Sequence, residues 1–101
     1  MHNMAFYVYI VTNKRNGTLY IGHTGDLVRR IWQHRTKIFD GFTRKYGCDR
    51  LVWFGEFPTR EEAKARERQM KAWRREWKIE EIEKTNPDWL DLSADFGPST
   101  G

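Results

Sequence analysis

The chain has 101 residues, a mass of 12.2 kDa, a net charge of +4 and a sequence pI near 9.4. This length corresponds to one domain and excludes a large multidomain enzyme, while 39% apolar and 15% aromatic residues leave little room for global disorder. The basic balance favours an anionic partner, and residues 1–50 carry most of it, with nine Lys and Arg against three Asp.

No segment of the sequence is apolar enough to predict a membrane span. The longest apolar stretch, Ala5 to Val11, is too short to cross a bilayer, and the N-terminus lacks a secretory pattern. We therefore expect a cytoplasmic protein with no membrane partner. The single cysteine, Cys48, cannot form an internal disulfide, and no Cys/His cluster with zinc spacing surrounds it.

The first predicted structure is a β-hairpin. Phe6–Val11 and Thr18–Ile21 are rich in β-branched and aromatic residues, with Asn-Gly at 16–17 between them. A two-residue turn there would place Tyr20 opposite Asn13, and a longer loop would change this pairing. Side chains alternate along a strand. One face then holds Tyr7, Tyr9 and Tyr20, and the other holds Phe6, Val8, Ile10, Leu19 and Ile21.

A helix is predicted to follow the hairpin. Gly22 ends the strand, Thr24 or Asp26 can cap the helix, and the helix runs to about Thr36. One stripe of this helix points inward, and Arg30 lies beside that stripe. The stripe consists of Leu27, Ile31, His34 and Ile38.

A loop and a third strand come next. Residues 39–49 contain two glycines and are expected to form a loop or a short irregular helix. Leu51–Phe57 has the composition of a strand, and Pro58 ends it.

A second long helix is predicted to begin after Thr59, which forms a capping-box pattern with Glu62. Its inward stripe holds Ala63, Met70 and Trp73 or Trp77, and it also holds Glu67. A buried carboxylate without a partner is costly. We therefore expect Glu67 to pair with a base, bind a metal or line a wet cleft.

The last part of the chain predicts a short helix, a turn and a tail. Arg75 to Lys84 is helical in pattern, and Asn86-Pro87-Asp88 is typical of a turn. Residues 93–101 are expected to form a disordered C-terminal tail. One domain over residues 1–92 precedes that tail.

The polar residues suggest phosphodiester chemistry. The sequence contains no phosphate-binding glycine loop, no nucleophile elbow and no zinc-binding helix motif. It does contain two tyrosines on one face, a basic helix with Arg30 and His34, and the unusually placed Glu67. An arginine can neutralise developing phosphorane charge, a glutamate can hold a divalent ion, and a tyrosine or histidine can move a proton.

These same residues resemble a known family. Tyr7-Val8-Tyr9, followed after ten residues by Tyr20-Ile21-Gly22, resembles the paired motif of the GIY-YIG nuclease superfamily. The following pattern Gly22-x-Thr24-x-x-Leu27-x-x-Arg30-x-x-x-His34 is similar to that superfamily's helix, as is the later helix with Glu67. The resemblance covers residues 5–79 and extends to the small stand-alone bacterial members. It implies an α+β fold with a three-stranded antiparallel sheet flanked by helices.

The resemblance also implies a metal-dependent endonuclease that cleaves DNA phosphodiesters in DNA repair or processing. Glu67 would coordinate Mg²⁺ or Mn²⁺, and Arg30 would stabilise the pentavalent transition state. Tyr9 would act as the general base or position it, and Tyr20 would orient the water or the phosphate. His34 stands where relatives have a residue that contacts phosphate or relays a proton.

Some positions depart from the family pattern. Tyr7 replaces the glycine of the first triplet, which could narrow the cleft, and the catalytic helix lacks a terminal Asn that many relatives have. His23 follows the second triplet, where relatives often have Lys. It is expected to bind the phosphate together with Arg30 and His34. No primary group is missing, so we expect activity to be retained.

Other interpretations stay open. Arg30 and Glu67 could form a salt bridge between two helices, Tyr9 and Tyr20 could be ordinary strand residues, and His34 could be a core histidine. The chain could be a catalytically inactive nucleic-acid-binding module, or a protein-interaction domain with an acidic tail. We expect DNA as the partner, a monomer, and recognition that follows DNA structure more than sequence, because a single small module makes mainly phosphate contacts.

Overall fold

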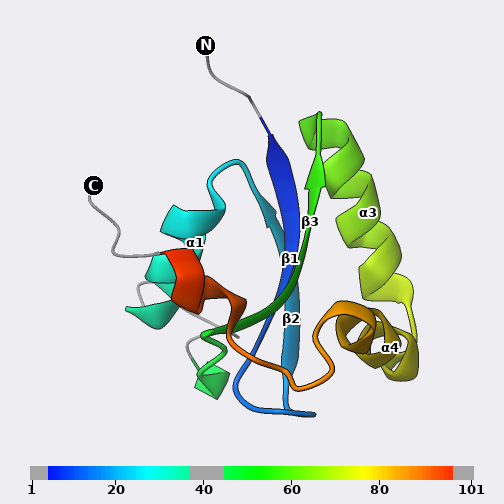
Figure 1. Cartoon of the computed structure of the whole chain (residues 1–101). Coiled ribbons are helices and arrows are strands. Elements are labelled where there is room, and N and C mark those ends of the chain that lie inside the picture. The colour runs from blue at the N-terminus through cyan, green and yellow to red at the C-terminus, as the bar shows by residue number, and fades with distance from the viewer. Residues whose placement is uncertain (1–4, 37–44, 97–101) are drawn as a thin grey trace.

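The computed structural model describes residues 5–36 and 45–96 and shows a three-stranded sheet with helices on both faces (Figure 1). In chain order the elements are β1 (Phe6–Thr12), β2 (Leu19–Thr24), α1 (Leu27–Arg35), β3 (Arg50–Phe57), α3 (Arg60–Ala72), α4 (Arg75–Thr85) and the 3-10 helix η1 (Leu92–Phe96). The predicted α+β fold is confirmed. Most of the predicted loop at 39–49 lies outside the described residues. None of the helices in the described ranges has the length and apolar character that a bilayer span requires.

The sheet has β1 at its centre. The strand order is β2-β1-β3, and both outer strands are antiparallel to β1, as expected for the predicted sheet. The register between β1 and β3 shifts after Ile10, so that Val52 is an extra residue between the paired Leu51 and Trp53. The sheet therefore has two edge strands, β2 and β3.

The hairpin register differs from the prediction. Asn16 adopts a φ of 57°, a left-handed conformation that asparagine tolerates well, and the turn is centred on residues 15–16. Tyr20 consequently pairs with Val11 and not with Asn13. The observed partner of each β1 residue on β2 is therefore two residues away from the predicted partner. Because side chains alternate along a strand, a shift of two residues leaves every side chain on its predicted face.

The two faces of the sheet are covered by different layers. α1 and η1 lie over one face, and α3 and α4 lie over the other (Figure 1). The alternation of side chains along β1 and β2 is as predicted, and each face has its own apolar cluster. The cluster under α1 includes Tyr9, Val11, Leu27, Ile31 and Leu51, and the cluster under α3 includes Val8, Ile10, Ile21, Ala63 and Met70.

The helix starts also follow the prediction. Asp26 caps α1 by accepting a hydrogen bond from the Arg29 N–H at 3.1 Å, and Thr59 caps α3 by accepting from the Glu62 N–H at 3.1 Å. α1 buries the predicted Leu27, Ile31 and His34, whereas Ile38 lies outside the described residues. The cap fixes where α1 begins, and the buried stripe fixes which of its sides faces the sheet.

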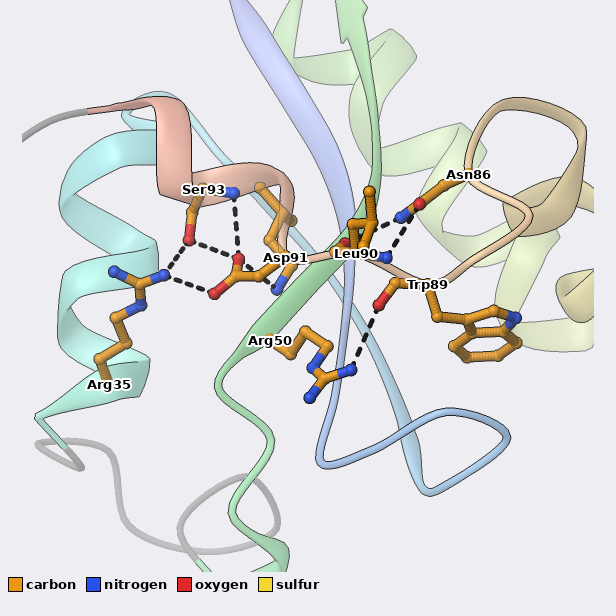
Figure 2. Close-up of polar contacts among 8 residues, drawn as sticks. Arg35, Arg50, Asn86, Trp89, Leu90, Asp91 and Ser93 are labelled. Carbon is orange, nitrogen blue, oxygen red and sulfur yellow. Dashed lines mark hydrogen bonds and ion pairs between the residues drawn. The ribbon is translucent and has the colours of Figure 1, made fainter.

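Residues 86–96, here called the C-terminal strap, run beside β3 (Figure 2). The predicted disordered tail is wrong for residues 93–96, because these residues form most of η1 and Ser93 is buried. The order comes from contacts with distant parts of the chain, which a local pattern cannot reveal. Residues 97–101 lie outside the described residues.

Side chains of the strap hydrogen-bond to the main chain of β3. Asn86 is buried and donates from Nδ2 to the carbonyl of Val52 at 3.1 Å. It also donates to the carbonyl of Leu90 at 2.9 Å (Figure 2). Asp91 Oδ1 accepts a hydrogen bond from the Leu51 N–H at 3.3 Å. The extra residue of β3 thus has a partner for its carbonyl, and this edge of the sheet is covered.

The strap also connects the two helical layers. Arg35, the last residue of α1, forms an ion pair with Asp91 Oδ2 at 2.6 Å. Trp89 is fully buried in the cluster under α3 and donates from its indole Nε1 to Glu83 at 2.7 Å. One short segment therefore joins α1, β3 and α4.

Candidate functional site

Three of the predicted site residues meet under α1. The Tyr9 hydroxyl lies 3.0 Å from His34 Nε2, within hydrogen-bonding distance. The ring of Tyr20 lies 6.4 Å from that of Tyr9 and 5.7 Å from that of His34, measured between ring centroids. β1 and β2 supply the two tyrosines from adjacent strands, and the inward stripe of α1 supplies the histidine.

The electrostatics of this group favour neutral side chains. Burial, and after it Tyr20, raises the pKa of Tyr9 above its ordinary value, while Arg30 opposes that rise without cancelling it. Burial, and after it the charge of Arg30, lowers the pKa of His34 to about 4. Near pH 7 the structure therefore joins a protonated phenol to a neutral imidazole, beside the positive charge of Arg30.

Gly22 makes room for this group. It pairs directly with Tyr9, and a Cβ atom at Gly22 would lie 2.6 Å from the Tyr9 hydroxyl and 2.7 Å from Cζ. The tyrosine side chain therefore crosses β2 at the one position that has no side chain. The prediction that Gly22 ends the strand is wrong, because β2 continues to Thr24.

A second group lies on the opposite face of β2. His23 follows Gly22 and faces α3, where its Nδ1 contacts Oε1 of Glu67. Lys71, one turn further along α3, contacts Oε2 of Glu67 at 2.5 Å. The side chain of Glu67 is 15% exposed and that of Lys71 is 53% exposed, so this group is open to solvent on one side.

Two basic partners determine the charge state of Glu67. Burial alone would raise the pKa of Glu67, but hydrogen bonds and charge from Lys71 and His23 outweigh burial and hold the pKa below its ordinary value. Glu67 is therefore ionised near neutral pH. The expectation that this carboxylate would pair with a base is confirmed.

The tyrosine group and the carboxylate group interact electrostatically across β2. Glu67 is among the charges that raise the pKa of Tyr9, after burial and Tyr20, and Arg30 acts on both Tyr9 and His34. Gly22 and His23 are consecutive residues, and they connect the tyrosine group on one face to the carboxylate group on the other. The predicted site residues thus lie on the two faces of one short stretch of β2. Tyr9, Tyr20 and His34, with Arg30 acting on them, are on the α1 side, and His23 and Glu67 are on the α3 side.

The donor atoms of this site fit a weakly held divalent ion. Within residues 5–36 and 45–96, no three His, Cys, Asp or Glu side chains form a metal-binding cluster. Mg²⁺ commonly binds proteins through one or two carboxylates and completes its shell with water and substrate phosphates. Glu67 offers one ionised carboxylate, but its two oxygens contact His23 and Lys71, so an ion would have to replace at least one of these basic partners.

Tyr7 is not part of either group. It lies two residues before Tyr9 on the same face and packs edge-on against Phe54, at 6.3 Å between ring centroids. With Phe54, Val28 and Phe96 it lines a hollow of about 290 Å³ on the flank of α1 that faces the strap. Its large side chain therefore packs beside Phe54 and not in the space that Gly22 leaves for Tyr9.

Lys71 is the residue that the sequence prediction missed. The only available signal was its position four residues after Glu67, a spacing at which helical side chains meet. An exposed lysine at that spacing is common on helix surfaces, so the pattern alone could not mark it.

Comparisons with known proteins found a family model and several relatives that are similar to this chain. The family described as the GIY-YIG catalytic domain matches residues 5–80. The chain is 38% identical over 76 residues to a UPF0213 protein of Haloquadratum walsbyi, covering 75% of this chain and 84% of that protein. It is 37% identical over 76 residues to a UPF0213 protein of Clostridium perfringens, covering 75% of this chain and 81% of that protein.

A third relative has a solved structure. UPF0213 protein BH0048 of Halalkalibacterium halodurans is 43% identical over 60 residues, which span 59% of this chain and 63%, slightly under two thirds, of that protein. The solution NMR structure of BH0048 superposes with a TM-score of 0.55 and 31% identity, covering 91% of this chain and 98% of that chain. The fold described above is therefore shared with this protein.

Proposed function

The chain belongs to the GIY-YIG catalytic domain family, and on that premise we propose that it is a metal-dependent endonuclease that hydrolyses DNA phosphodiester bonds. The observation that carries the proposal is the gathering of Tyr9, Arg30, His34 and Glu67 around Gly22 and His23 of β2. These groups can bind a phosphate, hold a divalent ion and move a proton, which are the parts that phosphodiester hydrolysis needs.

Each side chain has a proposed role. Glu67 would hold Mg²⁺ or Mn²⁺, which when bound would polarise the phosphate and lower the pKa of a bound water. Arg30 would neutralise the charge that develops on the pentavalent phosphorus. Tyr20 would orient the water or the phosphate. His23, between Glu67 and the edge of β2, would contact the phosphate.

Tyr9 and His34 would work as a pair. The raised pKa of Tyr9 keeps its phenol protonated near neutral pH, so the phenol cannot remove a proton from water unless it first passes its own proton on. The neutral imidazole of His34, at 3.0 Å, is the acceptor within reach. We assign Tyr9, which is 1% exposed, as the group that relays the proton and His34 as the group that takes it.

Recognition would follow DNA structure more than sequence. A domain of 101 residues offers a small surface, and contacts to the phosphate backbone carry no sequence information. Nicks, flaps, branches or single-stranded segments would be the substrates, consistent with a role in DNA repair or processing in the cytoplasm.

The test is cleavage of supercoiled and branched DNA with Mg²⁺ or Mn²⁺. Wild type is compared with Arg30→Ala and Glu67→Gln, and with the matched controls Arg29→Ala and Glu62→Gln, which change neighbouring exposed residues. We expect loss of cleavage in the first two and near-normal cleavage in the controls. Full activity in both Arg30→Ala and Glu67→Gln would refute the assignment.

One observation favours an alternative function. Lys71 and His23 already occupy both oxygens of Glu67, and this pairing could be a stable end state in a nucleic-acid-binding module without catalysis. Salt-dependent binding of DNA without cleavage in either divalent ion would support that function.

A further inference from the structure

Helix α3 has two flanks that differ in charge. The flank toward β2 carries Glu67, which contacts His23, and it also carries Lys64 and Lys71, three residues before and four residues after Glu67. Arg68 lies beside them on the outer side of the same flank. We call Lys64, Arg68 and Lys71 the basic ridge.

The opposite flank, toward β3, is close to neutral. There the Arg66 guanidinium lies 6.0 Å from the centroid of the Phe57 ring, and Glu62 and Gln69 line the same open hollow. On this flank the positive charge of Arg66 is balanced by the negative charge of Glu62. On the other flank the three cations of the ridge outnumber the two carboxylates, Glu67 and the bordering Glu61. The asymmetry in positive charge therefore points toward the edge of the sheet that holds the candidate site.

The cations of the ridge are available to a partner. Lys64 and Arg68 are exposed, and neither forms an ion pair with any residue in the described ranges 5–36 and 45–96. Lys71 has one partner, Glu67, and its side chain is still 53% exposed. Because Lys71 already neutralises Glu67, the carboxylate repels an approaching anion less than it would alone.

We propose that the basic ridge binds the phosphate backbone of a DNA duplex and so places one strand against the candidate site. The inference rests on the proposed function and adds to it the surface that holds the substrate. Seven residues separate Lys64 from Lys71, which corresponds to about 10 Å along the helix axis. That length spans about three nucleotides of one strand, at roughly 3.4 Å per nucleotide.

The experiment measures binding of a fluorescently labelled DNA duplex by anisotropy, in EDTA and over about 50 to 200 mM salt. The variants are Lys64→Gln, Arg68→Gln and the double variant, and Arg66→Gln on the other flank is the matched control. Each lost phosphate contact reduces the slope of log affinity against log salt by about 0.9. We expect a reduction of about 1 in each single variant, about 2 in the double variant and none in Arg66→Gln.

Glu67→Gln gives an independent arm of the same experiment. Removing the carboxylate frees Lys71 for a phosphate and removes a negative charge from the ridge, so duplex binding in EDTA should become tighter and its salt slope steeper. A neutral substitution that only disturbed the fold would weaken binding instead.

Three results would overturn the inference. They are a wild-type chain that does not bind the duplex, a double variant with the wild-type slope, and an equal loss in Arg66→Gln. The outcome is separable from the proposed function because no divalent ion is present. DNA binding through the ridge by a chain that never cleaves would contradict the endonuclease alone, and cleavage with unchanged salt slopes would contradict the ridge alone.

Discussion

The two edges of the sheet are used in opposite ways. Along β3, the strap covers the edge with buried residues, and Asn86 and Asp91 bond directly to its main chain. Along β2, the chain places a glycine and a histidine, with ionisable groups gathered around them. If the proposed function is correct, this small sheet commits one edge to stability and leaves the other to chemistry.

Each edge has one carboxylate with a lowered pKa, Asp91 at β3 and Glu67 at β2. Asp91 accepts hydrogen bonds from Ser93 and Leu51 and pairs with Arg35, and although burial alone would raise its pKa, these partners hold the pKa below its ordinary value. Glu67 also has a lowered pKa, but one of its two partners is the exposed Lys71. Both carboxylates have one exposed basic partner, Arg35 or Lys71, but Asp91 also accepts hydrogen bonds from the Leu51 N–H and from Ser93, which fix it to β3 and to the strap.

The largest expected effect is a loss of cleavage activity at the β2 edge with little change in the free energy of unfolding. Glu67→Gln should lower cleavage by about 10²–10³-fold, the loss typical of removing one preorganised electrostatic group. Its free energy of unfolding should change by less than about 1 kcal/mol, because ion pairs with exposed partners contribute little. Cleavage rates and urea unfolding of the same preparations test this, and a large loss of stability would contradict the division between the edges.

The reverse pattern is expected at the β3 edge. Asn86→Ala removes three hydrogen bonds of a buried side chain and should lower the free energy of unfolding by about 2–3 kcal/mol. The folded fraction should cleave DNA at the wild-type rate. Leu90→Ala, at a side chain in the same strap that is 63% exposed, is the control and should change stability by less than about 0.5 kcal/mol.

The pH dependence of stability should report His34. Its pKa in the folded chain is about 4, below the ordinary 6.5, so the unfolded chain takes up the proton first as pH falls. Stability should therefore be lost between pH 6.5 and about 4, by about 3 kcal/mol, and this contribution is fully present above pH 6.5. Urea unfolding across this range should show a flatter profile for His34→Gln. An identical profile in the variant would show that another group is responsible.

A change in stability smaller than that of Asn86→Ala is expected for Gly22→Ala. The added methyl would overlap the Tyr9 hydroxyl, so we expect a loss of about 1–2 kcal/mol and a displaced Tyr9–His34 contact. Gly25→Ala is the matched control, because its Cβ would lie 3.4 Å from the nearest Phe6 atom, an ordinary contact. Equal stability and equal cleavage in the two variants would contradict the role given to Gly22.

Local patterns in the sequence predicted the elements well. The caps at Asp26 and Thr59 and the two faces of the hairpin depend on neighbouring residues, and the structure confirms them. The turn position was missed because it depends on which residue adopts a left-handed conformation, and here Asn16 does so. The face prediction remained correct because the register error was an even number of residues.

The strap could not be predicted in the same way. Asn86 and Asp91 lie in a segment that is typical of turns and tails, and their partners, Val52 and Arg35, are far away in the sequence. For the site, the inward position of Glu67 gave a usable signal, whereas Lys71 and the fit of Tyr9 against Gly22 depend on the folded arrangement.

Titration with Mn²⁺ followed by NMR tests the central claim, that the chemistry belongs to the β2 edge, most directly. A bound paramagnetic ion broadens the resonances of the residues around it. We predict that the amides of Gly22, His23 and Glu67 broaden first, and that those of Asn86 to Ser93 are unaffected at the same concentration. Broadening that begins in the strap, or that spreads evenly over the domain, would contradict this account.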